Sequence, residues 1–285
     1  LIMKIIKYFI EAFFIYSFFI IIKIIGLKNS RFLFSFIFNK IGPLVKSKKI
    51  INQNIDTALK RCSNKRKKEI ISNMWSNYGM TFVEYLYLNK FKNTDSHINI
   101  KGKEILNKII KNKKPVIFVS GHFANFELMS MELTKAGIDL ATIYRPLNNF
   151  FLNPFMEYLR KNYVCKNQIK KGITGIRHSL DYLKKNYCIA LMIDQRVSEG
   201  IQLPFFKKKA LTTTLPAQLA LKFNCNIVPV YISRKKNKYF EMKIFNPIKI
   251  SKKNKTDVSL NLNKVLERMI MLDPSQWIWT HNRWK

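Results

Sequence analysis

Apolar and polar positions mark the first 45 residues as different from the rest of the chain. Residues 1–27 read LIMKIIKYFIEAFFIYSFFIIIKIIGL, an apolar stretch interrupted by charges such as Lys7, Glu11 and Lys23. Its uncharged run of residues 12–22 is shorter than the roughly 20 residues that span a bilayer core. The next segment, NSRFLFSFIFNKIGPLV, is again apolar and aromatic. Two such helices flanked by Lys and Arg are typical of a membrane anchor or interfacial segment.

Residues 1–27 have two other possible roles besides a retained anchor. A cleaved signal peptide is disfavoured, because no small-residue cleavage site follows the apolar run. An ordinary core helix remains the other alternative. We therefore divide the chain into an anchor at 1–45 and a catalytic domain at 46–285, the latter beginning with a basic helical region at 46–95.

From residue 115 onward, short apolar runs alternate with helical patterns. Strands are predicted at 115–120, 139–145, 187–194 and 226–233, with an edge strand at 239–245 and a loop around the LPFF of 203–206. Helices are predicted near 153–162, 174–185, 213–223 and 260–271. This order predicts an α/β sandwich, with a mixed, largely parallel sheet flanked by helices.

The chain carries a large positive net charge, which indicates the kind of partner it binds. The 285 residues include 51 Lys and Arg against 17 Asp and Glu, a formal net charge of +34, while 47% hydrophobic residues exclude a disordered chain. Such a charge favours nucleic acid, an anionic membrane or an acidic protein as partner. Between Lys46 and Lys68 the chain is rich in Lys and Arg, and Asp56 is the only acidic residue. This stretch predicts contact with anionic headgroups on the cytoplasmic side; a solvated helix face is the alternative.

Metal chemistry finds no support in the sequence. The four cysteines are scattered without a C-x-x-C pair, and the four histidines lie far apart along the chain. Zinc sites usually place two ligands close together in sequence. We therefore predict no metal, no cofactor and a reduced compartment.

One histidine lies where a parallel sheet presents functional groups. In VIFVSGHFANFELMS, His122 directly follows an apolar strand and Glu127 comes five residues later. Residues five apart on one helix point about 140° away from each other. His122 should therefore occupy the turn before a helix that begins near Ala124, with Glu127 one turn in and reaching back.

That arrangement suits a general base. A carboxylate that accepts from one imidazole nitrogen fixes the tautomer and raises the basicity of the other nitrogen. His122 would then deprotonate an acceptor hydroxyl as it attacks a thioester, with donors at the helix start facing the oxyanion. A nucleophilic Ser120 or cysteine is a weaker option, because G-x-S-x-G is absent and no cysteine adjoins a histidine.

The stretch HFANFE resembles the H-x-x-x-x-D/E signature of the glycerolipid and lysophospholipid acyltransferase superfamily. Within it, the likeness is to the late acyltransferases of lipid A biosynthesis, the lauroyl and myristoyl transferases. The segments IYRPLNNFFLN, MIDQRVSEGIQLPFF, VPVY and PSQWIWTHNRWK carry the same resemblance, and so do the anchor and the INQNID helix. LPFFKKKA departs from it, with a lysine where a glycine often follows the paired Phe.

The resemblance implies roles residue by residue. His122 and Glu127 would form the catalytic dyad, and Arg145 would lie in the acceptor-binding block. Asp194 and Gln195 match a D-Q motif whose individual roles it leaves open. Arg145 would hold a lipid phosphate through paired hydrogen bonds; a structural ion pair with Asp194 is the alternative.

The end of the chain mixes aromatic and cationic residues. Trp277, Trp279, His281, Arg283 and Trp284 would suit a membrane-interface or headgroup-binding patch. Core packing is the alternative, and it is favoured for Trp277 and Trp279.

The resemblance implies an acyltransferase of lipopolysaccharide biosynthesis that moves a fatty acyl chain from acyl carrier protein to a lipid A precursor. It would work at the cytoplasmic face of the inner membrane, where the positive charge suits an acidic donor, an anionic acceptor and an anionic membrane. One alternative is an acyl-coenzyme A-dependent enzyme acting on another glycolipid, such as a mannosylated phosphoinositide. Another is a non-catalytic basic protein that binds membrane or nucleic acid, but the ordered motifs disfavour it, and no nucleic-acid partner is predicted.

Overall fold

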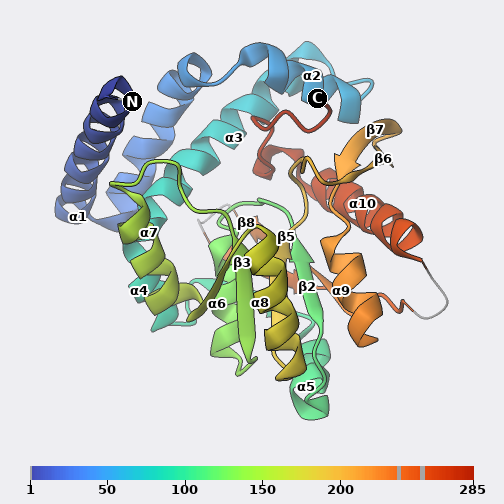
Figure 1. Cartoon of the computed structure of the whole chain (residues 1–285). Coiled ribbons are helices and arrows are strands. Elements are labelled where there is room, and N and C mark those ends of the chain that lie inside the picture. The colour runs from blue at the N-terminus through green and yellow to red at the C-terminus, as the bar shows by residue number, and fades with distance from the viewer. Residues whose placement is uncertain (1, 236–238, 251–253) are drawn as a thin grey trace.

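A twisted, mostly parallel sheet forms the centre of the molecule. The computed structural model describes residues 2–235, 239–250 and 254–285. Seven strands pair in the order β1-β9-β8-β2-β5-β3-β4, and only the β8–β9 pair among them is antiparallel (Figure 1). The predicted fold class is confirmed. The strands of this sheet are β1 (Ile98–Lys101), β2 (Ile117–Ser120), β3 (Leu140–Tyr144), β4 (Asn167–Lys170), β5 (Cys188–Met192), β8 (Ile227–Arg234) and β9 (Phe240–Ile244).

Helices cover both faces of this sheet. Alternate residues of β2 point to opposite sides, so Ile117 and Val119 join one apolar core and Phe118 joins the other. The first core is closed by α2, α3, α8, α9 and α10, and the second by α4, α5 and α6. The helices are α1 (Ile2–Val45), α2 (Lys48–Ala58), α3 (Asn64–Glu84), α4 (Leu88–Lys92), α5 (Lys103–Asn112), α6 (Glu127–Lys135), α7 (Asn153–Leu159), α8 (Ile173–Lys184), α9 (Leu215–Phe223) and α10 (Lys255–Leu272).

The helix α1 is two helical segments folded back on each other. Gly26 breaks the run with φ 77° and ψ 165°, a conformation that glycine adopts readily. The second segment returns beside the first, where the Phe18 and Phe34 rings lie 5.6 Å apart (Figure 1). It also packs closely on α3, because a Cβ on Gly79 would come within 2.1 Å of the Phe34 carbonyl oxygen. α1 ends at Val45, where we divide the chain, and that division stays a prediction.

Most of the surface of α1 is exposed and apolar. The helix has a mean hydropathy of 2.1 over its most apolar window, of which 17% is buried. By length and composition it is able to cross a membrane. The buried residues of its first segment are Ala12, Phe19 and Ile22.

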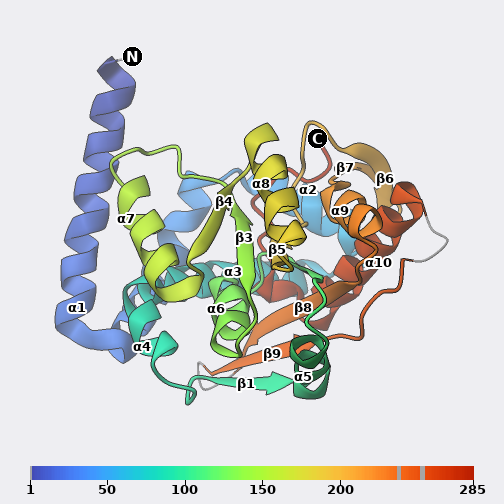
Figure 2. The ribbon, with the colours of Figure 1, turned by 60° about the horizontal axis from the view of Figure 1, so that its bottom comes forward.

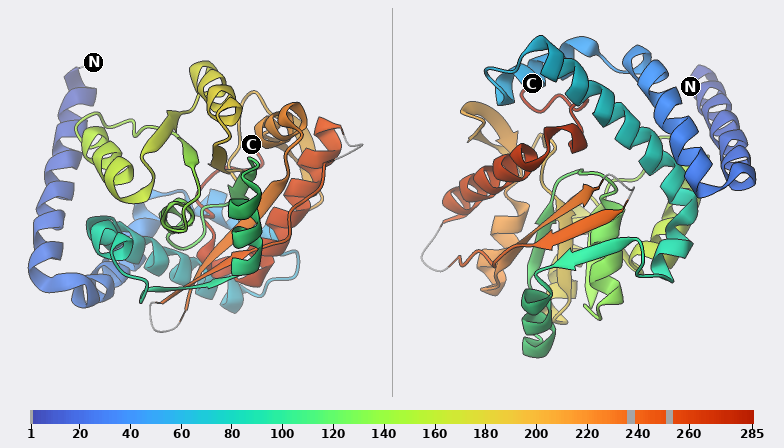
Figure 3. Two further views of the ribbon diagram at one scale, coloured as in Figure 1. Left: turned by 90° about the horizontal axis from the view of Figure 1, so that it is seen from below. Right: turned by 180° about the vertical axis from the view of Figure 1, so that it is seen from behind.

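Three details of the predicted fold were wrong. The LPFF segment is no loop: β6 (Ile201–Phe205) and β7 (Lys208–Thr212) form an antiparallel hairpin, which packs on α10 through Asn263. β9 is not an edge strand, because β1 pairs along its outer side. β1 and β4 were not predicted, since each has four residues and a mixed apolar and polar pattern. Figures 2 and 3 show the hairpin beside α9 and α10, and β1 beside β9.

Candidate active site

His122 lies in a tight turn at the carboxyl end of β2. The Phe123 N–H donates to the Gly121 carbonyl at 2.8 Å, so the chain reverses within three residues. A Cβ on Gly121 would come within 2.8 Å of the Phe123 ring, which is why glycine fits here. Ala124 adopts φ 44°, and α6 begins only at Glu127. The turn therefore presents the imidazole at the edge of the sheet, as the sequence predicted.

Asp194 is the carboxylate that holds this imidazole. It follows β5, the neighbour of β2, and its Oδ1 lies 2.7 Å from Nδ1 of His122. The other oxygen, Oδ2, accepts from the backbone N–H of His122 at 2.9 Å and from Trp277 Nε1 at 2.8 Å. Burial alone would raise the pKa of Asp194, but His122 and Trp277 stabilise the anion and lower this pKa to about 2.

The ionised carboxylate fixes the tautomer of His122. Because Asp194 only accepts hydrogen bonds, Nδ1 carries the proton and Nε2 keeps its lone pair. Nε2 has no hydrogen-bond partner among the described residues, and the side chain is 19% exposed. Burial lowers the pKa of His122, but Asp194, and more weakly Glu127, raise it above its ordinary value overall. This is the electronic arrangement of a general base.

Glu127 does not contact His122, so the predicted hydrogen bond between them is wrong. Its Oε1 instead accepts from Nε and Nη2 of Arg160, at 2.9 and 2.6 Å, and from the Tyr85 hydroxyl at 2.9 Å. The predicted contact assumed a helix that begins near Ala124. Because Ala124 adopts a left-handed conformation, α6 begins only at Glu127, and the Glu127 side chain points toward Arg160. Whether Glu127 takes part in catalysis stays a prediction.

Glu127 and Arg160 form a nearly buried ion pair. Their side chains are 8% and 13% exposed. Burial disfavours the guanidinium, but Glu127 raises the pKa of Arg160 overall. Burial also raises the pKa of Tyr85 far above its ordinary value, and the Glu127 charge adds to that shift. The negative charge of Glu127 is therefore neutralised locally and reaches His122 only as a field.

Arg145 and Gln195 lie at the same edge but make no specific contact. Arg145 follows β3, is exposed, and has no hydrogen bond or ion pair within the described part of the chain. Its predicted alternative partner, Asp194, is occupied by His122 and Trp277, so the structural ion pair is wrong. Gln195 is half-buried beside Asp194. The proposed substrate contacts of both residues stay predictions.

Three of the five residues of the predicted C-terminal patch are buried, and the other two, His281 and Trp284, are half-buried. Trp277, Trp279 and Arg283 are 2%, 0% and 0% exposed, so core packing is confirmed for the two tryptophans. The guanidinium of Arg283 lies over the Phe205 ring and donates to the Leu211 carbonyl at 2.7 Å. Exposed aromatic rings are what an interfacial patch requires, and these side chains do not provide them.

The same segment supports the Asp194 loop. Trp277 donates to Asp194, and His281 Nε2 accepts from the backbone N–H of Arg196 at 2.9 Å. Burial lowers the pKa of His281, which keeps this nitrogen free to accept. Two side chains of the terminal motif thus fix the strand-to-loop turn that carries Asp194.

The sequence matches a known protein family over almost its whole length. Residues 2–285 match the family described as bacterial lipid A biosynthesis acyltransferase. The chain belongs to this family. It is therefore an acyltransferase, and the resemblance noted in the sequence is confirmed.

Curated relatives agree with the family assignment. The chain is 22% identical over 247 residues to the lipid A biosynthesis lauroyltransferase of Escherichia coli (strain K12), covering 83% of the chain and 78% of that protein. It is 22% identical over 251 residues to the lipid A biosynthesis palmitoleoyltransferase of the same organism, covering 85% and 80%. The lipid A biosynthesis acyltransferase of Shigella flexneri matches with the same identity and coverage.

The turn at His122 also rests on a buried ion cluster that sequence reasoning missed. Glu84 on α3 is fully buried and accepts from Arg31 Nε at 2.7 Å and from the guanidinium of Arg234. Its Oε2 also accepts from Asn125 Nδ2 at 3.0 Å, inside the turn that follows His122. The cluster ties α1, α3 and β8 to this turn. The sequence signal was weak: Glu84 is a single charge inside an apolar run, whereas Arg31 and Arg234 lie far from it along the chain and next to other polar residues.

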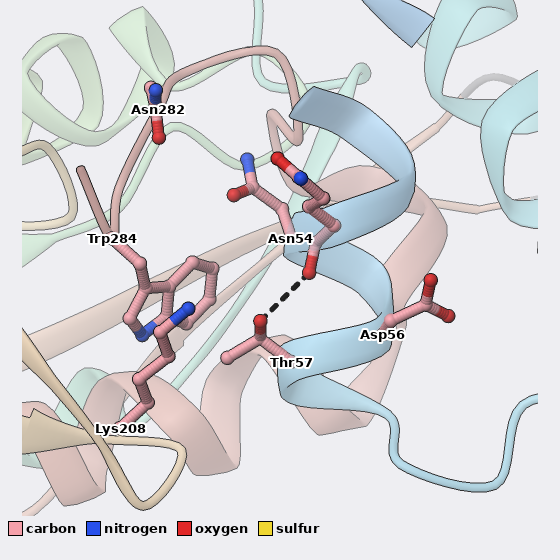
Figure 4. A pocket seen from close by; sticks show the side chains of 7 residues that line it. Asn54, Asp56, Thr57, Lys208, Asn282 and Trp284 are labelled. Carbon is pink, nitrogen blue, oxygen red and sulfur yellow. Dashed lines mark hydrogen bonds between the residues drawn. The ribbon is translucent and has the colours of Figure 1, made fainter. Parts of the chain in front are cut away.

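A polar pocket of about 380 Å³ lies between α2, the start of β7 and the C-terminal segment (Figure 4). Neither His122 nor Asp194 lines it. One of its lining residues, Asn54 on α2, donates to the carbonyls of Trp279 and His281 at 2.8 and 2.7 Å. The INQNID helix thereby holds the segment that supports Asp194. The pocket is lined by Gln53, Asn54, Asp56, Thr57, Lys208, Asn282 and Trp284.

Proposed function

We propose that this acyltransferase moves a fatty acyl chain from acyl carrier protein to a hydroxyl of a lipid A precursor, with His122 as general base. The observation that carries the proposal is the His122–Asp194 pair at the carboxyl edge of the sheet, where Nε2 of His122 keeps its lone pair and the imidazole side chain is partly exposed. The family assignment supports the lipid A-type acceptor.

The reaction passes one proton from the acceptor hydroxyl to His122 and then from His122 to the leaving thiolate. Nε2 of His122 takes the proton of the acceptor hydroxyl while its oxygen bonds to the thioester carbonyl carbon. The imidazolium that forms is stabilised by Asp194, 2.7 Å from Nδ1. As the tetrahedral intermediate collapses, the carbon–sulfur bond breaks and the imidazolium returns the proton to the thiolate. No covalent enzyme intermediate is needed.

Asp194 replaces Glu127 as the direct partner of His122 in this proposal. Glu127 acts through Arg160, which it holds beside the site, and through its charge, which raises the pKa of His122. Arg145 would bind an acceptor phosphate from the neighbouring strand end, and Gln195 would contact substrate beside Asp194. Each role belongs to a residue at the carboxyl edge of the sheet or directly behind it.

Charge and the apolar surface of α1 support the proposed donor and location. A net charge of +34 would attract the acidic surface of an acyl carrier protein and an anionic bilayer alike. The exposed apolar face of α1 supports attachment to the inner membrane, with the basic stretch between Lys46 and Lys68 placing the catalytic domain on the cytoplasmic face.

Transfer is tested with purified full-length protein, a lipid A precursor and either acyl carrier protein or coenzyme A as the acyl donor, with the product measured by mass spectrometry. His122→Ala should lower the rate by about 100-fold or more. His178→Ala is the matched control, because His178 is exposed on α8 and away from Asp194. Faster transfer from acyl-coenzyme A would overturn the donor, and near-normal turnover of His122→Ala would overturn the mechanism.

A further inference from the structure

Four large apolar side chains outside α1 are exposed at one edge of the molecule. Leu147 and Phe150, in the loop after β3, are 40% and 50% exposed. Ile173 and Ile176, in the first turn of α8, are 78% and 41% exposed. The two isoleucines are three residues apart, so they share one face of the helix. These four residues are called the apolar rim below.

The rim lies at the same sheet edge as His122. β2, β3, β4 and β5 are parallel, so the segments that follow them all leave the sheet at its carboxyl edge. His122 follows β2, Asp194 follows β5, and the two halves of the rim follow β3 and β4. Whatever covers the rim therefore also lies near the sheet edge that carries His122.

The rim continues the exposed face of α1. The Phe150 ring packs on Tyr8 with ring centres 5.9 Å apart, and Asn149 Nδ2 donates to the Tyr8 carbonyl at 2.8 Å. The Tyr16 hydroxyl donates to the Phe151 carbonyl at 3.0 Å. Figures 1 and 2 show the loop between β3 and α7 beside the first segment of α1. The most apolar helix of the protein thus approaches the rim directly.

Cations accompany the isoleucine half of the rim. Lys171 and Arg177 are exposed on either side of Ile173 and Ile176, and Lys170 is exposed beside them although it pairs with Glu157. Apolar side chains flanked by Lys and Arg are typical of segments that lie in an anionic membrane interface. The composition therefore fits a lipid surface better than an apolar protein partner.

We propose that the apolar rim lies in the headgroup region of an anionic bilayer, as a second membrane contact besides α1, and turns the sheet edge that carries His122 toward the lipid surface. The proposal rests on the proposed function only in that the acceptor is a lipid held in that membrane. With α1 as the sole attachment, the catalytic domain would be free to tilt; the second contact fixes the height and angle of the site.

Nitroxide labels on the full-length protein in phosphatidylethanolamine–phosphatidylglycerol vesicles test the orientation. In a Cys62→Ser background, which leaves three buried cysteines, one protein carries Ile173→Cys and the matched control carries Lys184→Cys. Both sites are on α8, at opposite ends of its 12 residues. That length is about 18 Å, enough to separate headgroups from water.

The Ile173 label should be relaxed by oxygen and shielded from a water-soluble nickel complex, and the Lys184 label should show the reverse. Equal access of the nickel complex to both labels would overturn the proposal. Because this readout does not need turnover, lipid contact without acyl transfer would refute only the proposed function. Acyl transfer with a water-exposed Ile173 would refute only the rim.

A kinetic arm addresses the consequence for catalysis. The double variant Ile173→Asp/Ile176→Asp should raise KM for acceptor in anionic vesicles roughly tenfold, because two carboxylates are repelled from the interface. In detergent micelles with dispersed acceptor, its rate should stay within about twofold of the original, which excludes misfolding. Unchanged KM in vesicles, or the same loss in both media, would contradict the proposal.

Discussion

At the scale of single residues, the partner of His122 decides how activity depends on pH. With His122 as the proposed general base, its neutral form is the active one, so the rate should rise as pH increases through its pKa. Burial lowers this pKa and Asp194 raises it above the ordinary value. Asp194→Asn removes the raising influence, so the acidic limb of the pH–rate profile should move to lower pH. The maximal rate should also fall by about 100-fold or more, because the imidazolium loses its counter-ion.

The profile is measured as kcat against pH for both proteins. An acidic limb that stays in place in Asp194→Asn would mean that Asp194 does not set the pKa of the catalytic base.

Trp277 tests how Asp194 itself is held. Trp277→Phe keeps most of the buried ring but removes the N–H that donates to Oδ2 at 2.8 Å. This hydrogen bond, of a kind worth roughly 1.5–3 kcal/mol, holds Asp194 in position beside His122, so the loss of positioning should lower kcat by about tenfold. The freed carboxylate should also attract imidazolium more strongly, which moves the acidic limb to higher pH. Trp279→Phe is the control, because Trp279 Nε1 donates to the Pro274 carbonyl and not to Asp194.

Kinetics and pH profiles of the two variants are compared with their melting temperatures. An equal loss of kcat in both, with no shift of the limb in Trp277→Phe, would show that the residue only packs.

Substitution of Glu127 distinguishes a structural role of this residue from a role in the reaction. Glu127→Gln leaves Arg160 charged and nearly buried without its counter-ion. Removing one partner of such a pair typically costs roughly 3–5 kcal/mol, so the melting temperature should fall clearly. The pH–rate profile should shift less than in Asp194→Asn, since Glu127 influences His122 only at a distance. A stable Glu127→Gln protein without activity would instead place Glu127 in the reaction.

Arg145 has no hydrogen-bond or ion-pair partner in the part of the chain that the structure describes, which makes its substitution informative. Arg145→Lys keeps the charge but loses the bidentate fork that fits a phosphate. Because Arg145 is exposed and unpaired within the described residues, the melting temperature should not change. KM for the acceptor should rise while kcat changes little. An unchanged KM would remove Arg145 from the acceptor site.

The sequence placed His122 correctly in the turn after β2 but predicted a contact with the wrong carboxylate. His122 and Glu127 are five residues apart, whereas Asp194 comes 72 residues after His122 and reaches it only because β2 and β5 are neighbours. A single sequence carries local spacing, and strand order depends on tertiary packing. The same limit hid Trp277, whose contact with Asp194 joins residues 83 apart.

At the scale of secondary structure, long and strongly patterned elements were predictable. The apolar runs at β2, β5 and β8 are fully or largely buried, and such runs identify strands without knowledge of their neighbours. The start of α6 was not predictable, because Ala124 adopts φ 44° in the structure and alanine gives no signal for that conformation. The β6–β7 hairpin was missed for a related reason: Phe206 and Lys207 form its turn at φ 50° and 63° without a glycine.

At the scale of the whole molecule, two kinds of attraction to the membrane can be separated. The first segment of α1 offers exposed apolar surface, whereas residues 46–68 offer exposed lysines and arginines on α2 and the start of α3. Apolar insertion is insensitive to salt. Attraction between charges is screened, with a Debye length of about 10 Å at 0.1 M salt and 3 Å at 1 M.

After deletion of residues 1–27 the protein should therefore still bind membranes, but its binding should become sensitive to salt. The segment contributes only Ala12, Phe19 and Ile22 to the buried residues of α1, and the rest of α1 stays packed on α3, so the catalytic fold should survive. The truncated protein should bind anionic vesicles at about 0.1 M salt and release at about 1 M, as screening of its basic residues predicts. The full-length protein should stay bound at both. Co-sedimentation measures this, and circular dichroism checks the fold. Release of the full-length protein by salt alone would show that α1 does not insert, and loss of fold in the truncated protein would make α1 part of the catalytic domain.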